Sequence, residues 1–89
     1  MRESSIETYL RNRVKQLGGL AYKFVSPGYN GVPDRLVCLP GGKLIFVELK
    51  APGKKPTALQ LRRHDELRKL GFKVYSCVDS KAKVEEILG

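Results

Sequence analysis

Two ionisable residues near the end of an apolar run give the sequence its clearest chemical signal. Glu48 and Lys50 close the segment KLIFVELK, whose composition is typical of a core strand. Side chains two residues apart leave a strand on the same face, so we expect this carboxylate and this amine to lie side by side. Ionised groups on a core strand are costly unless a partner or a metal ion neutralises them. The pair therefore predicts a functional site.

A second carboxylate, Asp34, precedes the neighbouring predicted strand, residues 35–39. The turn PGG joins that strand to residues 43–49 as a β-hairpin. With the turn centred on its two glycines, position 34 should lie opposite about position 49, which brings Asp34 within reach of Glu48. Two converging carboxylates are hard oxygen ligands of the kind that Mg²⁺ and Mn²⁺ prefer.

Seven elements are needed to position these residues, and they fit one α/β domain over residues 1–89. Their order, α-β-β-β-α-β-α, indicates a mixed sheet flanked by helices. The helices are expected over residues 4–17, 57–70 and 80–88, and the strands over residues 20–25, 35–39, 43–49 and 72–78.

The two longer predicted helices each have an apolar stripe and a defined start. Ser4 is the expected N-cap of the first helix, and Ser4-x-x-Glu7 matches a capping box. Thr57-x-x-Gln60 at the start of the second helix is another capping box. The expected stripes are Ile6, Leu10, Val14 and Leu17 in the first helix and Leu59, Leu67 and Leu70 in the second.

The motif GVPD (residues 31–34), followed fourteen residues later by ELK (residues 48–50), resembles the PD-(D/E)XK nuclease signature. The expected element order resembles the restriction-endonuclease-like core of that superfamily. Within it, Glu7 on the first helix, the VELK strand and Gln60 after a Pro-Thr helix start resemble the VRR-NUC branch. The likeness spans essentially the whole chain, whose small size resembles the stand-alone viral and bacterial members.

This resemblance implies a metal-dependent site. Asp34, Glu48 and the backbone carbonyl of Leu49 would bind Mg²⁺ or Mn²⁺, which would activate a water molecule. Lys50 would orient that water or stabilise the charge that builds on the phosphate.

Three helical residues have competing interpretations. Glu7 borders the apolar stripe and would reach the metal through water, or it only satisfies the helix start. Gln60 would join the site, or it only completes its capping box. His64 follows Gln60 by one helical turn, but we expect this lone histidine on a basic helix to be solvated and leave it out of the site.

Seventeen Lys and Arg against nine Asp and Glu give a net charge of +8, which attracts polyanions. Lys54, Lys55, Arg62 and Arg63 cluster near the predicted site and are candidate DNA contacts, and Tyr29 in the preceding loop could stack on a base. The alternative for each is an ordinary solvated side chain. With two cysteines, no CxxC and one histidine, neither a disulfide framework nor a zinc site is supported.

Because 89 residues leave no room for a base-reading element, we expect a DNA endonuclease that selects its substrate by structure. The resemblance implies branched DNA, such as four-way (Holliday) junctions, as that substrate. Two cuts in a junction need two active sites, so we expect a homodimer. Two alternatives remain open: a monomeric flap or nick-processing nuclease, and a non-catalytic basic nucleic-acid-binding module. The polar N-terminus and the lack of a membrane-length apolar run predict a cytoplasmic protein, including a viral protein acting in a bacterial host.

Overall fold

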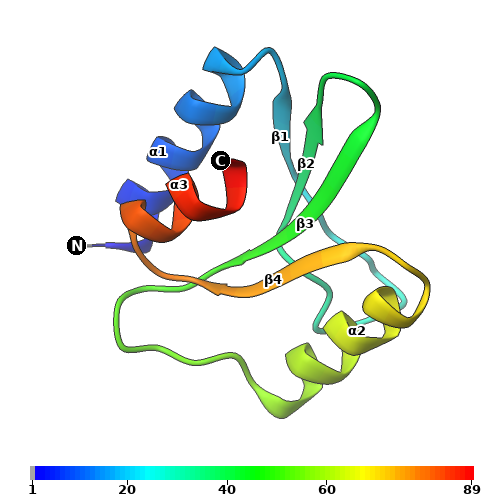
Figure 1. Cartoon of the computed structure of the whole chain (residues 1–89). Coiled ribbons are helices and arrows are strands. Elements are labelled where there is room, and N and C mark those ends of the chain that lie inside the picture. The colour runs from blue at the N-terminus through cyan, green and yellow to red at the C-terminus, as the bar shows by residue number, and fades with distance from the viewer. Residues whose placement is uncertain (1) are drawn as a thin grey trace.

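A computed structural model describes residues 2–89 and contains the predicted succession of helices and strands (Figure 1). The α/β order α-β-β-β-α-β-α is confirmed. No helix within the described residues is long and apolar enough to cross a membrane. The elements are α1 (Glu3–Gln16), β1 (Leu20–Lys23), β2 (Arg35–Leu39), β3 (Lys43–Leu49), α2 (Ala58–Lys69), β4 (Lys73–Val78) and α3 (Lys81–Leu88).

The sheet has the order β1-β2-β3-β4 and is mixed, because β1, β2 and β3 are antiparallel neighbours whereas β4 runs parallel to β3. Leu39 pairs with Lys43, so the turn holds three residues and is centred on Gly41. Continuing this register puts Asp34 opposite Glu48, one residue from the position predicted when the turn was centred on both glycines. Residues directly opposite share a face, so the two carboxylates lie on the same side of the sheet.

The main hydrophobic core lies between the sheet and the helix pair α1 and α3, which pack together on one face (Figure 1). Helix α2 lies on the other face, where it packs against β4 at the edge of the sheet. Buried side chains of the core are Ile6, Leu10 and Val14 from α1, Val37, Ile45, Val47, Leu49 and Val78 from the strands, and Val84 from α3.

Helix α1 begins earlier than predicted. Arg2 is its N-cap, with extended backbone angles (φ −96°, ψ 155°), and no side chain caps the helix. Ser4 therefore lies inside the first turn, and both the Ser4 N-cap and the Ser4–Glu7 capping box are wrong predictions. An N-cap needs an extended backbone, which the chain adopts at Arg2 and not at Ser4.

The start of α2 is confirmed, but its buried side is not the predicted one. Thr57 and Gln60 form a reciprocal capping box. Leu59 and Leu70 are 41% and 74% exposed, whereas His64 is fully buried. The predicted Leu59–Leu67–Leu70 stripe is therefore wrong as a core face. Because α2 packs against an edge strand, the sheet covers little of its apolar surface.

Candidate active site

The loop before β2 holds Asp34 in place. Gly31 has a φ of +88°, and a Cβ there would stand 3.1 Å from Leu59 Cγ, so the loop approaches α2 more closely than other residues allow. Pro33 is fully buried. The backbone N–H of Leu49 donates to Asp34 Oδ1 at 3.1 Å. The GVPD segment thereby fixes its aspartate beside the end of β3.

Glu48 is buried beside Asp34 on the α2 side of the sheet, with 4% of its surface exposed. Burial raises the pKa of Glu48 to about 7; the negative charge of Asp34 adds to the shift and Lys50 opposes it. Burial likewise raises the pKa of Asp34, although the hydrogen bond from the Leu49 N–H lowers it in part. Burial and the nearby Asp34 charge therefore disfavour the ionised form of Glu48, and a divalent cation beside the two carboxylates would offset both effects.

Lys50 lies beside Glu48, as their spacing predicted, and Gln60, a candidate through the family resemblance, contacts both and completes the cluster. Lys50 Nζ donates to Gln60 Oε1 at 2.9 Å and lies 3.7 Å from Glu48 Oε2. The same Gln60 oxygen accepts the Thr57 backbone N–H at 2.9 Å, while Gln60 Nε2 lies 3.5 Å from Glu48 Oε2. The capping and site interpretations of Gln60 are therefore compatible, because one side chain makes both sets of contacts.

His64 belongs to the cluster, and the expectation that it is solvated is wrong. Its Nδ1 lies 2.7 Å from Ser76 Oγ, and its Nε2 lies 3.7 Å from Glu48 Oε1. Among residues 2–89, these two facing atoms, His64 Nε2 and Glu48 Oε1, are the buried side-chain atoms without a hydrogen-bond partner. A buried polar atom left unpaired costs about 1–3 kcal/mol. The i, i+4 spacing from Gln60 was the signal that could have identified His64.

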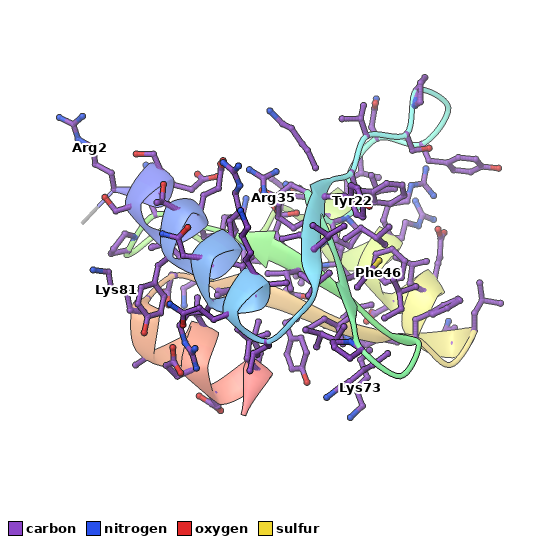
Figure 2. The ribbon with its side chains drawn as sticks, turned by 90° about the horizontal axis from the view of Figure 1, so that it is seen from above. Arg2, Tyr22, Arg35, Phe46, Lys73 and Lys81 are labelled. Atoms are coloured by element: carbon purple, nitrogen blue, oxygen red, sulfur yellow. The ribbon has the colours of Figure 1, made fainter. Side chains whose placement is uncertain are left out.

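Glu7 pairs with a residue that the sequence analysis did not consider. Its carboxylate forms an ion pair with Arg35, whose other terminal nitrogen donates to the Asp34 backbone carbonyl at 2.9 Å. Figure 2 places Arg35 between α1 and the strands, on the face opposite Glu48. Glu3 was also missed, and its negative charge contributes to the raised pKa of both Asp34 and Glu48.

The predicted DNA contacts divide into two groups. Lys54 and Lys55 are exposed on the segment that joins β3 to α2, a few residues after Lys50. Arg62 is exposed on α2, where it lines a shallow hollow with Asp65 and neighbouring residues of the same helix. The two lysines thus follow the site directly along the chain.

Arg63 and Tyr29 lie together, away from the carboxylates. The Arg63 guanidinium donates to the Asn30 carbonyl at 3.0 Å and to Glu66 at 3.1 Å, and it stands 5.2 Å from the centre of the Tyr29 ring. Tyr29 is 60% exposed. Arg63 therefore already ties α2 to the loop, and Tyr29 offers an open aromatic face.

The donor set of the cluster suits a hard cation. No group of three or more His, Cys, Asp and Glu side chains in residues 2–89 is placed to hold a metal. The predicted ligands are two carboxylates, Asp34 and Glu48, with the Leu49 carbonyl. Mg²⁺ is usually bound by one or two carboxylates and keeps several waters, so this oxygen set fits Mg²⁺ or Mn²⁺.

Comparisons with known proteins extend over most of the chain. No protein-family model matches it. "Putative nuclease p44" of Acyrthosiphon pisum secondary endosymbiont phage 1 is 64% identical over 74 residues, which cover 83% of this chain and 80% of that protein. A solved structure described as a VRR_NUC domain is 39% identical, with a TM-score of 0.89 over 97% of this chain and 92% of that one.

Proposed function

The chain belongs to the VRR-NUC nuclease family, and from this premise we propose that it is a metal-dependent, structure-selective DNA endonuclease. The observation that carries the proposal is a pair of carboxylates, the half-buried Asp34 and the buried Glu48, that face each other across the β2–β3 hairpin. Burial raises the pKa of both carboxyl groups, and the charge of Asp34 adds to the shift at Glu48. Lys50 alone offsets this only in part.

Each residue of the cluster has a role in phosphodiester hydrolysis. Asp34, Glu48 and the Leu49 carbonyl would hold Mg²⁺ or Mn²⁺, which supplies a Lewis acid for the phosphate and an activated water. The Lys50 ammonium group donates one of its three hydrogens to Gln60, which holds the amine in place. The other two hydrogens can donate to a phosphate oxygen as negative charge develops there. Glu7 would act indirectly, because Arg35 holds its carboxylate.

The substrate is DNA, contacted through its phosphates. The net charge of +8 favours a polyanion, and the exposed Lys54 and Lys55 would extend the contact from the site. Arg62, Arg63 and Tyr29 are weaker candidates, since Arg63 is already engaged by Asn30 and Glu66. Selection by shape favours branched DNA, with four-way junctions as the first substrate to test. The phage relative supports action in the cytoplasm of a bacterial host.

A homodimer would supply the second active site that a junction requires. Leu20, Cys38 and Leu44 form one cross-strand row, and Tyr22, Leu36 and Phe46 form the next, on the face that carries α2. Leu20 and Tyr22 are 56% and 50% exposed, because α2 covers the opposite edge of the sheet. An exposed apolar face of this kind favours self-association.

A cleavage panel tests this proposal. Single-stranded, flap, nicked and four-way DNA are incubated with the protein in Mg²⁺, Mn²⁺ or EDTA. We expect cleavage of the four-way substrate with either ion and none with EDTA or with Asp34→Ala. Lys50→Ala should lower the cleavage rate about 10²–10³-fold while DNA binding remains nearly intact, since the amine acts on charge that develops in the transition state.

The matched control is Lys43→Ala, which removes an exposed lysine from the far end of the same strand and should cut at the wild-type rate. If every substrate survives both ions, the chain is a basic binding module and the proposal fails. If a monomer cuts flaps or nicks and leaves junctions intact, the metal site stands but the substrate and the dimer are wrong.

A further inference from the structure

The imidazole of His64 is fully buried and is aimed at a site carboxylate. Its Nε2 and Glu48 Oε1 face each other at 3.7 Å, and neither atom has another hydrogen-bond partner. This separation exceeds an ordinary N–H···O bond by roughly 0.8 Å. Hydrogen bonds in active sites are often long in the free protein and tighten in the loaded complex. A donor on Nε2 would satisfy both buried atoms at once.

The surroundings of the ring determine which nitrogen carries its proton. Arg68 donates to Ser76 Oγ at 2.7 Å, and the same oxygen lies 2.7 Å from His64 Nδ1. A guanidinium can only donate, so the Ser76 hydroxyl accepts from it and has its own hydrogen free to donate to Nδ1. The imidazole proton is then on Nε2 and points to Glu48. With Glu48 ionised, the form that binds a cation, the other tautomer would bring two lone pairs together in a buried space.

Arg68 is itself held in place on both sides. It donates to Asp65 at 2.8 Å on its own helix and to the Val74 carbonyl at 2.8 Å on β4. The chain of donors therefore begins at a fixed cation and ends at Glu48.

We propose that His64 is a positioning residue, whose Nε2–H holds Glu48 Oε1 so that Oε2 stays beside Lys50 and Gln60 and the carboxylate is ready to bind the cation. This inference rests on the proposed metal-dependent function. The Oε2 atom is the one close to both other side chains, at 3.7 Å from Lys50 Nζ and 3.5 Å from Gln60 Nε2. Without the imidazole, the buried carboxylate loses the partner that selects this orientation.

Mn²⁺ binding to the full chain, measured by calorimetry without DNA, tests the role apart from catalysis. His64→Asn keeps a partner for Ser76 but cannot reach Glu48, and it should raise the Kd for Mn²⁺ about 10–100-fold. His64→Gln places an amide nitrogen near the position of Nε2 and should bind Mn²⁺ within about threefold of wild type. Ser76→Ala keeps the ring but frees its tautomer, and should weaken binding to an intermediate degree.

Val74→Ala is the matched control for a merely structural effect. The Val74 side chain is buried on β4 beside α2, and alanine keeps the backbone carbonyl that accepts from Arg68, so the change should lower the Tm and leave the Kd unchanged. The role is refuted if His64→Asn, or Ser76→Ala where His64→Asn does not fold, binds Mn²⁺ like wild type. It is also refuted if Val74→Ala has the same Tm as His64→Asn and weakens Mn²⁺ binding to the same extent. A wild-type chain that neither binds Mn²⁺ nor cuts DNA overturns the proposed function itself.

Discussion

At the scale of single residues, Glu48 binds a proton more tightly in the folded protein than in the unfolded chain. Its pKa rises from 4.5 to about 7, chiefly through burial and then through the charge of Asp34. A raised carboxyl pKa contributes stability that is present below pH 4.5 and is lost as the pH rises through about 7. We therefore expect the metal-free protein to lose up to about 3 kcal/mol of unfolding free energy across this window.

Urea denaturation without metal at about pH 5 and about pH 7.5 measures this loss. Glu48→Gln should flatten the dependence, because the amide does not titrate. Glu85→Gln is the control: Arg13 and then Tyr9 hold the pKa of Glu85 at about 2, so its contribution is lost only as the pH falls from 4.5 toward 2. A wild-type protein equally stable at both pH values would contradict the expected burial of Glu48.

The side-chain placements that the structure reproduces follow from local backbone rules. Glu48 and Lys50 share a face because strands alternate, and Gln60 lies at the third position of a recognisable cap. The burial of His64 was not predicted, because the sequence of α2 did not show which side of the helix faces the sheet. Arg35 is a charged residue inside an apolar strand, the same signal used for Glu48, yet the pairing with Glu7 depends on how α1 packs.

At the scale of elements, the sequence defined the order of helices and strands, but not the surfaces through which they meet. Glycine- and proline-rich segments separate the elements, so their succession could be predicted. The hairpin register differed by one residue, because a turn of three residues and a turn of two are equally compatible with PGG. The outward Leu59 and Leu70 could not be predicted, because a helix on an edge strand need not bury its apolar residues.

The start of α2 combines a helix cap and a site contact, and substitutions can separate them. Thr57→Ala removes the acceptor for the Gln60 N–H and should lower stability by about 1 kcal/mol with cleavage nearly unchanged. Gln60→Ala removes the cap and also the 2.9 Å partner of Lys50, so it should lose similar stability and most of the cleavage rate. Chemical denaturation and junction cleavage measure the two effects; equal cleavage by both variants would restrict Gln60 to capping.

At the scale of the whole molecule, Leu20 and Tyr22 expose the β1 end of the two apolar rows, on the same face as the candidate active site. In the proposed homodimer, a two-fold contact through this face would bury Leu20 and Tyr22 of both copies and would hold the two sites at a fixed separation. Leu20→Glu places a charge in the middle of such a contact. We expect this variant to be monomeric by light scattering and to nick a junction on one strand instead of making paired cuts.

Leu61→Glu is the matched control, since it makes the same change in charge at a leucine of similar character, 43% exposed on α2 and outside the rows. It should remain dimeric and make paired cuts, so that general repulsion of DNA by the added charge cannot explain a loss seen only with Leu20→Glu. The dimer of this face is ruled out if wild type is a monomer, or if Leu20→Glu still dimerises. Paired incisions by a demonstrated monomer would separate junction cleavage from dimerisation altogether, and would require two successive binding events at one site.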